Sequence, residues 1–250
     1  MEKLVANSGI LYVRASLRAL APQINQTQNV VDFLKAKIEF DEIFAPHFYG
    51  ARLLWRKRIN PHAKKTNSGA LGKSLLNLTG STLSGHPTHS FVGIGPKVET
   101  TLSEHNETSA CFDPIWKLSE SDDYSMLLIG CVDESPGFST VHATQERLGL
   151  ARRHLERLLL RWDYIDGDKV VSKVAPESPG CSESFDKFYD FYIEDDNFQS
   201  GNWDGVHWIY IQSARRAMRV EAEILSINPR FVKCKKIFCW TCTLRVYFKI

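Results

Sequence analysis

Imidazoles and hydroxyls gather in two short stretches of the chain. Residues 81–95 read STLSGHPTHSFVGIG and hold His86 and His89, and residues 137–149 read GFSTVHATQERLG and hold His142. Both stretches fall in turns beside strongly apolar segments. A basic nitrogen beside hydroxyls at strand ends suits acyl transfer or proton transfer, although a few histidines in turns are not specific by themselves. The hydroxyls in these stretches are Ser84, Thr88, Ser90, Ser139 and Thr140.

The composition is that of an ordinary globular protein. Of the 250 residues 43% are hydrophobic and 24% are charged, and the net charge is only +2. This balance is too mild to indicate a nucleic-acid partner. We interpret the locally basic run from Arg52 to Lys65 as a solvated or phosphate-facing surface.

The amino-terminal residues do not resemble a signal peptide. Charged side chains interrupt the first apolar run at Arg14 and Arg18, and no small-residue cleavage site follows. No stretch reaches the roughly 18 apolar residues that a membrane span needs. We therefore expect a cytoplasmic protein without a membrane partner, and six cysteines in a chain of this length fit a reducing compartment.

Alternating apolar segments indicate an α/β fold that would position these turns. The sequence predicts buried strands at 10–13, 90–94 and 125–131, further strands at 170–174 and 208–211, and helices at 29–38, 70–78, 97–105, 141–162 and 213–225. Residues 184–193 are aromatic-rich and fit either state. The segment from Glu39 to Lys65 lacks a clear period, and we interpret it as an excursion over the surface.

Four blocks of the chain, in the same order, resemble the aminoglycoside 3-N-acetyltransferase family, antibiotic N-acetyltransferases that use acetyl-CoA. The blocks are LYVRASLRAL (11–20) followed by Pro22, NSGALG (67–72) leading into SGHPTHSF (84–91) and Ile94-Gly95, LLIG (127–130), and STVH (139–142). The resemblance covers about residues 8–230. It implies one α/β domain at 1–230 with a mixed central sheet flanked by helices, and residues 231–250 would form a cysteine-containing extension.

The resemblance also implies partners and an activity. The expected co-substrate is acetyl-CoA or a related acyl-CoA, the acceptor is a small-molecule amine, and the assembly that we consider is a homodimer. The alternative is a catalytically inactive relative that keeps the fold and binds a ligand or a partner.

Catalytic roles follow from the same match. His142 would be the general base, against the alternative of a buried, hydrogen-bonded histidine. Thr140, and with it Ser139, would bind the thioester region. The family's glutamate after this histidine falls on Gln145, and Glu146 follows one place later. A glutamine orients an imidazole but does not stabilise its charged form as a carboxylate does.

For the cofactor, the resemblance points to the first turn and to the His-Pro block. Arg14 stands where the family has a histidine, and Asn25-Gln26 replace a glycine pair that would approach the pyrophosphate. Those two side chains would obstruct the approach of backbone amides. The residues expected to contact CoA are Arg14, Ala15, Ser16, Leu17, His86 and Ser90.

Three cysteines form a C-x4-C-x2-C array near the carboxyl terminus, at Cys234, Cys239 and Cys242, and Cys181 is a candidate fourth ligand. Four thiolates would make a closed structural zinc site. A plant-type iron–sulfur pattern needs a further cysteine downstream, and the alternative interpretation is free or buried thiols.

Two further cysteines lie near the matched blocks, and a Cys–His pair would suggest acyl-enzyme chemistry. These are Cys111 and Cys131. Cys131 ends an apolar run, which favours a small core residue instead.

Overall fold

A computed structural model describes residues 7–24, 29–58 and 66–244. The prediction that Asn25 and Gln26 obstruct the pyrophosphate falls outside the described residues, as does the end of the basic run after Arg58. No helix in the described ranges is long and apolar enough to cross a membrane.

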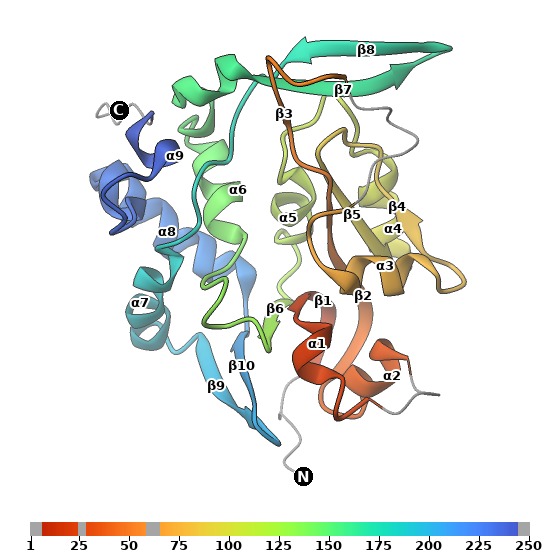
Figure 1. Cartoon of the computed structure of the whole chain (residues 1–250). Helices are drawn as coiled ribbons and strands as arrows, with labels where there is room; N and C mark the ends of the chain where they lie inside the picture. The colour runs from red at the N-terminus through yellow and green to blue at the C-terminus, as the bar shows by residue number, and fades with distance from the viewer. Residues whose placement is uncertain (1–6, 25–28, 59–65, 245–250) are drawn as a thin grey trace.

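A seven-stranded mixed sheet forms the centre of the fold (Figure 1). β1 pairs in parallel with β2 and β6, whereas β5 and β10 run antiparallel to their neighbours. The predicted single α/β domain with a mixed central sheet is therefore confirmed. In spatial order the strands are β4 (Thr82–Leu83), β5 (His89–Ile94), β2 (Glu39–Phe48), β1 (Asn7–Ala15), β6 (Tyr124–Ile129), β10 (Val206–Ile211) and β9 (Phe198–Trp203).

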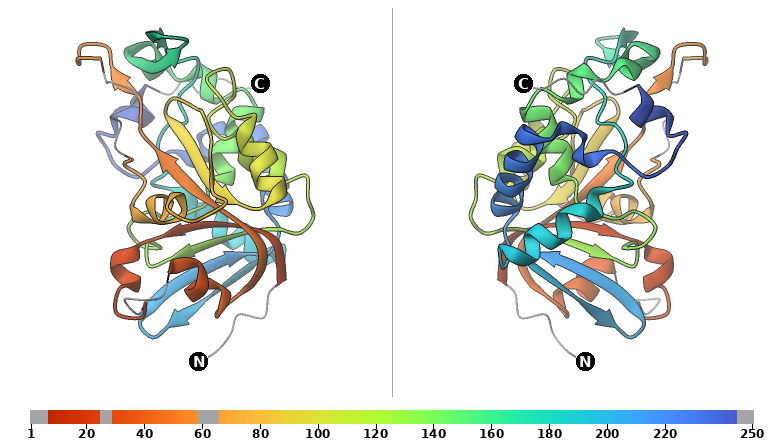
Figure 2. Two further views of the ribbon diagram at one scale, coloured as in Figure 1. Left: turned by 90° about the vertical axis from the view of Figure 1, so that its right-hand side faces the viewer. Right: turned by 90° about the vertical axis from the view of Figure 1, so that its left-hand side faces the viewer.

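Helices cover both faces of this sheet (Figure 2). One face carries α1 (Leu17–Leu20), α2 (Val30–Lys35) and α3 (Ala70–Leu76). The other carries α4 (Pro96–Ser103), α5 (Asp113–Leu118), α6 (Thr140–Arg147) and α8 (Ala214–Ile227). The shorter α7 (Tyr189–Glu194) and α9 (Trp240–Thr243) lie near the edge beside α8 in Figure 1.

The burial of both faces explains the unbroken apolar run of β1. Ile10 and Tyr12 point into one core cluster, and Leu11 and Val13 point into the other. Side chains alternate across a strand, so a strand covered on both sides needs apolar residues at every position. The central position of β1 therefore follows from its sequence.

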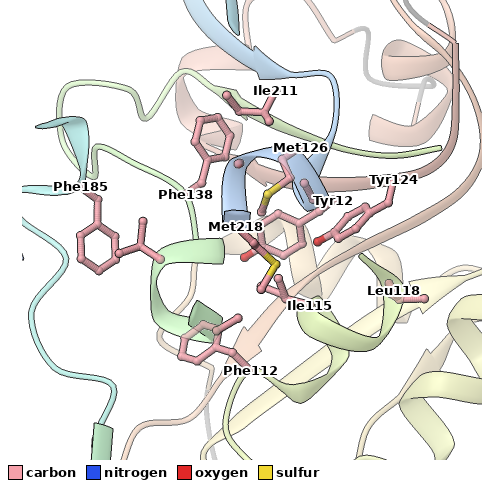
Figure 3. Close-up of a cluster of buried hydrophobic side chains, with 14 of the residues drawn as sticks. Tyr12, Phe112, Ile115, Leu118, Tyr124, Met126, Phe138, Phe185, Ile211 and Met218 are labelled. Atoms are coloured by element: carbon pink, nitrogen blue, oxygen red, sulfur yellow. The ribbon is translucent and has the colours of Figure 1, made fainter. Parts of the chain in front are cut away.

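Aromatic and sulfur-containing side chains fill the core between the sheet and α5, α6 and α8. Figure 3 shows Tyr12, Met126 and Met218 grouped at its centre. Tyr12 packs against Phe44 with ring centroids 5.0 Å apart. This core supports the helix that carries His142, because Val141 and Ala143 are buried in the same cluster.

Two segments differ from the sequence-based expectation. The predicted helix 141–162 is wrong beyond Arg147, because Gly149 adopts a positive φ of 69° and its amide binds the Glu146 carbonyl, which ends α6. Two 3-10 turns follow, Ala151–Arg153 and Leu155–Leu159, and then strand β7 (Leu160–Asp166). Aromatic and β-branched residues from Trp162 onward favour the strand once the glycine has ended the helix.

The segment after Glu39 is not a surface excursion either. It forms β2, the partner of β1 in the middle of the sheet. The six consecutive residues from Glu42 to His47 are buried there. Its mixture of aromatic, acidic and imidazole side chains hides the period of a strand that is covered on both faces.

Arg52 likewise does not face solvent. It lies in β3 (Arg52–Leu53), which joins β7 and β8 (Lys169–Val174) in a separate three-stranded sheet. Its guanidinium donates to both carboxylate oxygens of Asp163, at 2.7 and 3.1 Å, and both side chains are buried. A bidentate buried pair of this kind fixes one strand against the next.

Candidate functional site

A pocket of about 900 Å³ opens at the carboxyl ends of the parallel strands β1 and β6. β1 lies between β2 and β6, so the strand order reverses at β1. Open α/β sheets bind ligands at such a reversal, outside the carboxyl ends of the strands. The pocket wall includes the end of β1, the loop after β6, the start of α6 and the segment at 177–182. The two stretches that the sequence singled out both reach it, through His89 and His142.

His142 lies in the first turn of α6 and on the pocket wall, with 8% of its surface exposed. Its ring stacks on Phe112, with centroids 4.8 Å apart and planes 28° apart, and meets the edge of Phe185 at 4.7 Å. Two aromatic contacts from different segments hold the imidazole in one orientation. A base at this position on the pocket wall could take a proton from a substrate bound in the pocket.

Ser139 also lines the pocket and shares a 2.9 Å hydrogen bond with the hydroxyl of Tyr12. Burial raises the pKa of Tyr12 to about 12, so this phenol stays protonated at neutral pH. The buried Tyr12 therefore holds the side chain of Ser139, which lines the pocket.

Thr140 is buried and is not among the pocket-lining residues. Its hydroxyl donates to the Glu221 carboxylate of α8, as do Thr144 and Tyr192. Thr140 therefore anchors α6 to α8, and Ser139 occupies the position on the pocket wall. Burial raises the pKa of Glu221 to about 7, although the three hydroxyl donors lower it.

Gln145 and Glu146 lie in the last turns of α6, and neither lines this pocket. Gln145 is buried. The Glu146 carboxylate accepts a 2.9 Å hydrogen bond from the backbone amide of Phe112, the residue that stacks on His142. Burial and the nearby Glu177 carboxylate raise the pKa of Glu146 well above its usual value. Phe112 thus contacts both Glu146, through its amide, and His142, through its ring.

His86 and Ser90 lie behind the pocket wall. The Nδ1 atom of His86 accepts from the amides of Thr88 and His89, and the Ser90 hydroxyl donates to the His86 carbonyl at 2.6 Å. Neither residue is among the pocket-lining residues, whereas His89 is. The His-Pro turn therefore shapes the wall through its own hydrogen bonds.

A second imidazole packs on His86. The His105 ring stacks on it with centroids 4.7 Å apart and planes 14° apart. Burial lowers the pKa of His105 to about 4, and burial together with His105 lowers that of His89 to about 3. Burial thus makes both imidazoles weak bases, and of the two histidines that line the pocket, His89 and His142, the latter is the better candidate base.

The first turn contributes Val13, Arg14, Ala15 and Ser16 to the pocket, and Leu17 is not among the lining residues. Arg14 donates to the Gly137 carbonyl at 2.9 Å and to Ser135, so it ties the end of β1 to the loop before α6. Gly137 has a φ of 80°, and a Cβ there would lie 2.0 Å from that of Phe185, so only glycine fits.

Carboxylates on the pocket wall were not anticipated from the sequence. Glu134, Glu156 and Glu177 come from three separate segments and line the pocket, and Arg14 is a cation in the same lining. Glu177 is buried and accepts from the amide of Cys111 at 2.7 Å. Their spacing along the chain carries no signal, because only the fold brings the three segments together.

Cysteine chemistry is disfavoured in this pocket. Burial raises the pKa of Cys111 well above its usual value, and Cys111 is not a lining residue. Cys131 does line the pocket, but burial raises its pKa too. A thiol is a weak nucleophile until it ionises, so neither residue is prepared for acyl-enzyme formation.

The four cysteines proposed as metal ligands come together away from the centre of the pocket. The sulfur atoms of Cys181, Cys234, Cys239 and Cys242 all lie within 4.8 Å of one another.

The fold and the pocket define an α/β protein with a pocket at the carboxyl ends of parallel strands and a histidine on the pocket wall. A family model described as aminoglycoside 3-N-acetyltransferase matches residues 2–225, and the chain belongs to this family. A search of curated proteins found no match.

Solved structures of the same fold include several aminoglycoside acetyltransferases. The apoenzyme of AAC(3)-IVa aligns with a TM-score of 0.76 at 19% identity, covering 97% of this chain and 91% of that one. AAC-IIIb in binary complex with CoASH aligns with a TM-score of 0.64 at 15% identity, covering 93% and 94%. A variant of AAC(3)-IVa in which a histidine is replaced by alanine, in complex with apramycin, aligns with a TM-score of 0.67 at 18% identity. The alignment covers 93% of this chain and 92% of that one.

Proposed function

We propose that the protein transfers an acetyl group from acetyl-CoA to an amine, with His142 as the general base. The observation that carries the proposal is the position of His142 on the wall of the pocket at the ends of β1 and β6. Membership of the acetyltransferase family supports the reaction class, and the CoASH complex of AAC-IIIb supports the co-substrate.

In the proposed reaction the amine nitrogen attacks the thioester carbonyl carbon. His142 takes the proton from the attacking amine, a C–N bond forms, the C–S bond breaks, and CoA leaves as a thiolate that takes up a proton. Ser139 would donate to the developing oxyanion, because it lines the pocket and its hydroxyl also bonds to that of Tyr12. No acyl-enzyme is required.

The acceptor that the pocket favours is a cationic amine. Three carboxylates, those of Glu134, Glu156 and Glu177, line the pocket. Arg14 lines it too and carries the opposite charge. Negative potential attracts protonated amines and raises their local concentration. Aminoglycosides such as apramycin, bound by the AAC(3)-IVa variant, are the first acceptors to assay.

Two measurements test the proposal. Calorimetric titration should show micromolar binding of acetyl-CoA and CoA, and His142→Ala should then lower the acetylation rate by about two to four orders of magnitude. His207→Ala, which replaces an exposed histidine of β10, is the matched control and should keep the parent rate.

The same measurements address the second candidate, a catalytically inactive relative. Tight binding of CoA without turnover of any amine, in the parent and in His142→Ala alike, would favour a binding protein. Absence of CoA binding at millimolar concentration would overturn the acyl-CoA proposal. A cytoplasmic location and a homodimer stay predictions, and light scattering would measure the assembly.

A further inference from the structure

Near the carboxyl terminus, two segments about 50 residues apart in sequence bring four thiols together. Cys181 follows the Pro179-Gly180 turn, and the other three lie between residues 234 and 242. None of the four forms a disulfide with another described cysteine. We propose that Cys181, Cys234, Cys239 and Cys242 bind one structural zinc ion, which fastens the carboxyl-terminal segment to the wall of the pocket.

The dimensions of the cluster fit a single tetrahedral ion. Zinc–sulfur bonds of about 2.3 Å in a tetrahedron place the sulfur atoms about 3.8 Å apart. The Cys234 and Cys242 sulfurs are 3.6 Å apart, and all four lie within 4.8 Å. A four-iron cluster would need a wider arrangement, because its cysteines bind different iron atoms.

The local backbone orders the carboxyl-terminal ligands. Cys239 is the residue before the first turn of α9, and Cys242 lies within that helix. The amide of Thr243 donates to the Cys239 carbonyl at 2.9 Å, which closes the turn that holds Cys239 and Cys242. A Cys-x2-Cys pair closed by such a turn points both sulfurs to one side, so little rearrangement is needed for metal binding.

Charge near the cluster is complementary. Four thiolates around a Zn²⁺ ion carry two net negative charges, and Lys235 and Lys236 lie in the turn between Cys234 and Cys239. The Lys236 ammonium pairs with Glu183 at 2.7 Å, which links this turn to the segment of Cys181. Because four protein ligands leave no open position, the ion would stabilise and not catalyse.

The cluster is joined to the pocket through its neighbours in sequence. Trp240 and Thr241 lie between two of the ligands, and Gly180 and Ser182 flank Cys181; all four line the pocket. The metal would therefore fix two parts of one wall. Its loss should weaken ligand binding, and this last step rests on the proposed function, whereas the metal content does not.

The test is metal analysis of protein produced with zinc and purified with a reductant. We expect about one zinc per chain, and replacement by Co²⁺ should give the visible absorption of tetrahedral cobalt–thiolate. Cys242→Ser should lose the metal, Cys242→His should keep it because imidazole also binds zinc, and Cys131→Ser outside the cluster should retain the parent content.

Removal of zinc by a chelator should lower the midpoint of thermal unfolding, and added zinc should restore it. Wild-type protein without zinc and without a cobalt spectrum would overturn the proposal, whether or not the variants fold. Zinc that survives in Cys242→Ser, iron in place of zinc, or a Cys234–Cys242 disulfide in the purified chain would overturn it equally.

Discussion

The imidazole of His142 and the ring of Phe112 lie nearly parallel, with their centroids 4.8 Å apart. The Phe112 amide is held by Glu146, one helical turn after His142 on the same helix. Helix α6 therefore carries both the candidate base and the carboxylate that fixes the base's stacking partner. This arrangement gives Glu146 a positioning role without contact to substrate.

Shortening this stacking partner should slow catalysis. Phe112→Leu removes the face that orients His142, and we expect kcat to fall by about ten- to a hundredfold, with the KM for acetyl-CoA little changed. Steady-state kinetics would measure the split. Phe188→Leu, a buried core change at a ring that packs on Tyr192 and Phe231, should cost about 1–2 kcal/mol of stability and leave kcat unchanged. An equal fall in both variants would show that Phe112 acts only through stability.

The carboxylates of the pocket lining, Glu134, Glu156 and Glu177, predict that the affinity for the acceptor depends on its charge. Glu134 is exposed on the pocket wall, and Glu134→Gln should raise the KM for a polycationic amine by about two- to fivefold at low salt, with kcat unchanged. The effect should shrink at high salt because exposed charges are screened. Asp133→Asn changes the neighbouring exposed carboxylate, which does not line the pocket. A rise in KM for both variants would indicate general attraction and not a site.

Acid should destabilise the protein through the stacked imidazoles. The His105 pKa is lowered to about 4 by burial, so the stability linked to the neutral ring is present above pH 6.5 and is lost as the pH falls toward 4. Its Nε2 donates to the Ala110 carbonyl, which leaves Nδ1 to accept from Ser84 and nowhere to add a proton without losing that bond.

His105→Gln should remove this part of the pH dependence. The difference in unfolding free energy between parent and variant should change by on the order of 3 kcal/mol from pH 6.5 to pH 4. Denaturant unfolding at several pH values would measure it. The exposed His207→Gln should follow the parent curve, and a pH-independent difference for His105→Gln would contradict the prediction.

Glu221 should act in the opposite direction. Burial raises its pKa to about 7, so the folded state holds the proton more tightly than the unfolded state. The stability linked to the protonated form is present below pH 4.5 and is lost as the pH rises through 7, by on the order of 3 kcal/mol. Glu221→Gln should therefore gain stability relative to the parent between pH 5 and pH 8.

The matched control is Glu223→Gln, on the exposed side of the same helix. It should differ from the parent by a constant amount over this pH range. If Glu221→Gln also differed by a constant amount, the pKa of the Glu221 carboxyl would not be raised, and the three hydroxyls that donate to it would hold it as a carboxylate. Urea unfolding at pH 5 and at pH 8 would measure the stability of the parent and of both variants.

The sequence by itself determined two of the central strands, β1 and β6, and the class of protein. The apolar runs of β1 and β6 can only be buried on both faces, and the His-Pro block with the later STVH turn is specific enough to indicate the family. Local chemistry also marked the end of α6 at Gly149, a signal that the leucine period from Leu148 to Trp162 concealed.

Only the tertiary structure decided which side chains share the pocket. Thr140 and Ser139 are adjacent in sequence, yet the Thr140 hydroxyl meets Glu221 and the Ser139 hydroxyl meets Tyr12, and only Ser139 lines the pocket. Neighbouring residues of a helix turn point about 100° apart. The acidic wall and the Phe112 contact of Glu146 join segments far apart in the chain. Packing sets such contacts, and spacing along one sequence does not encode them.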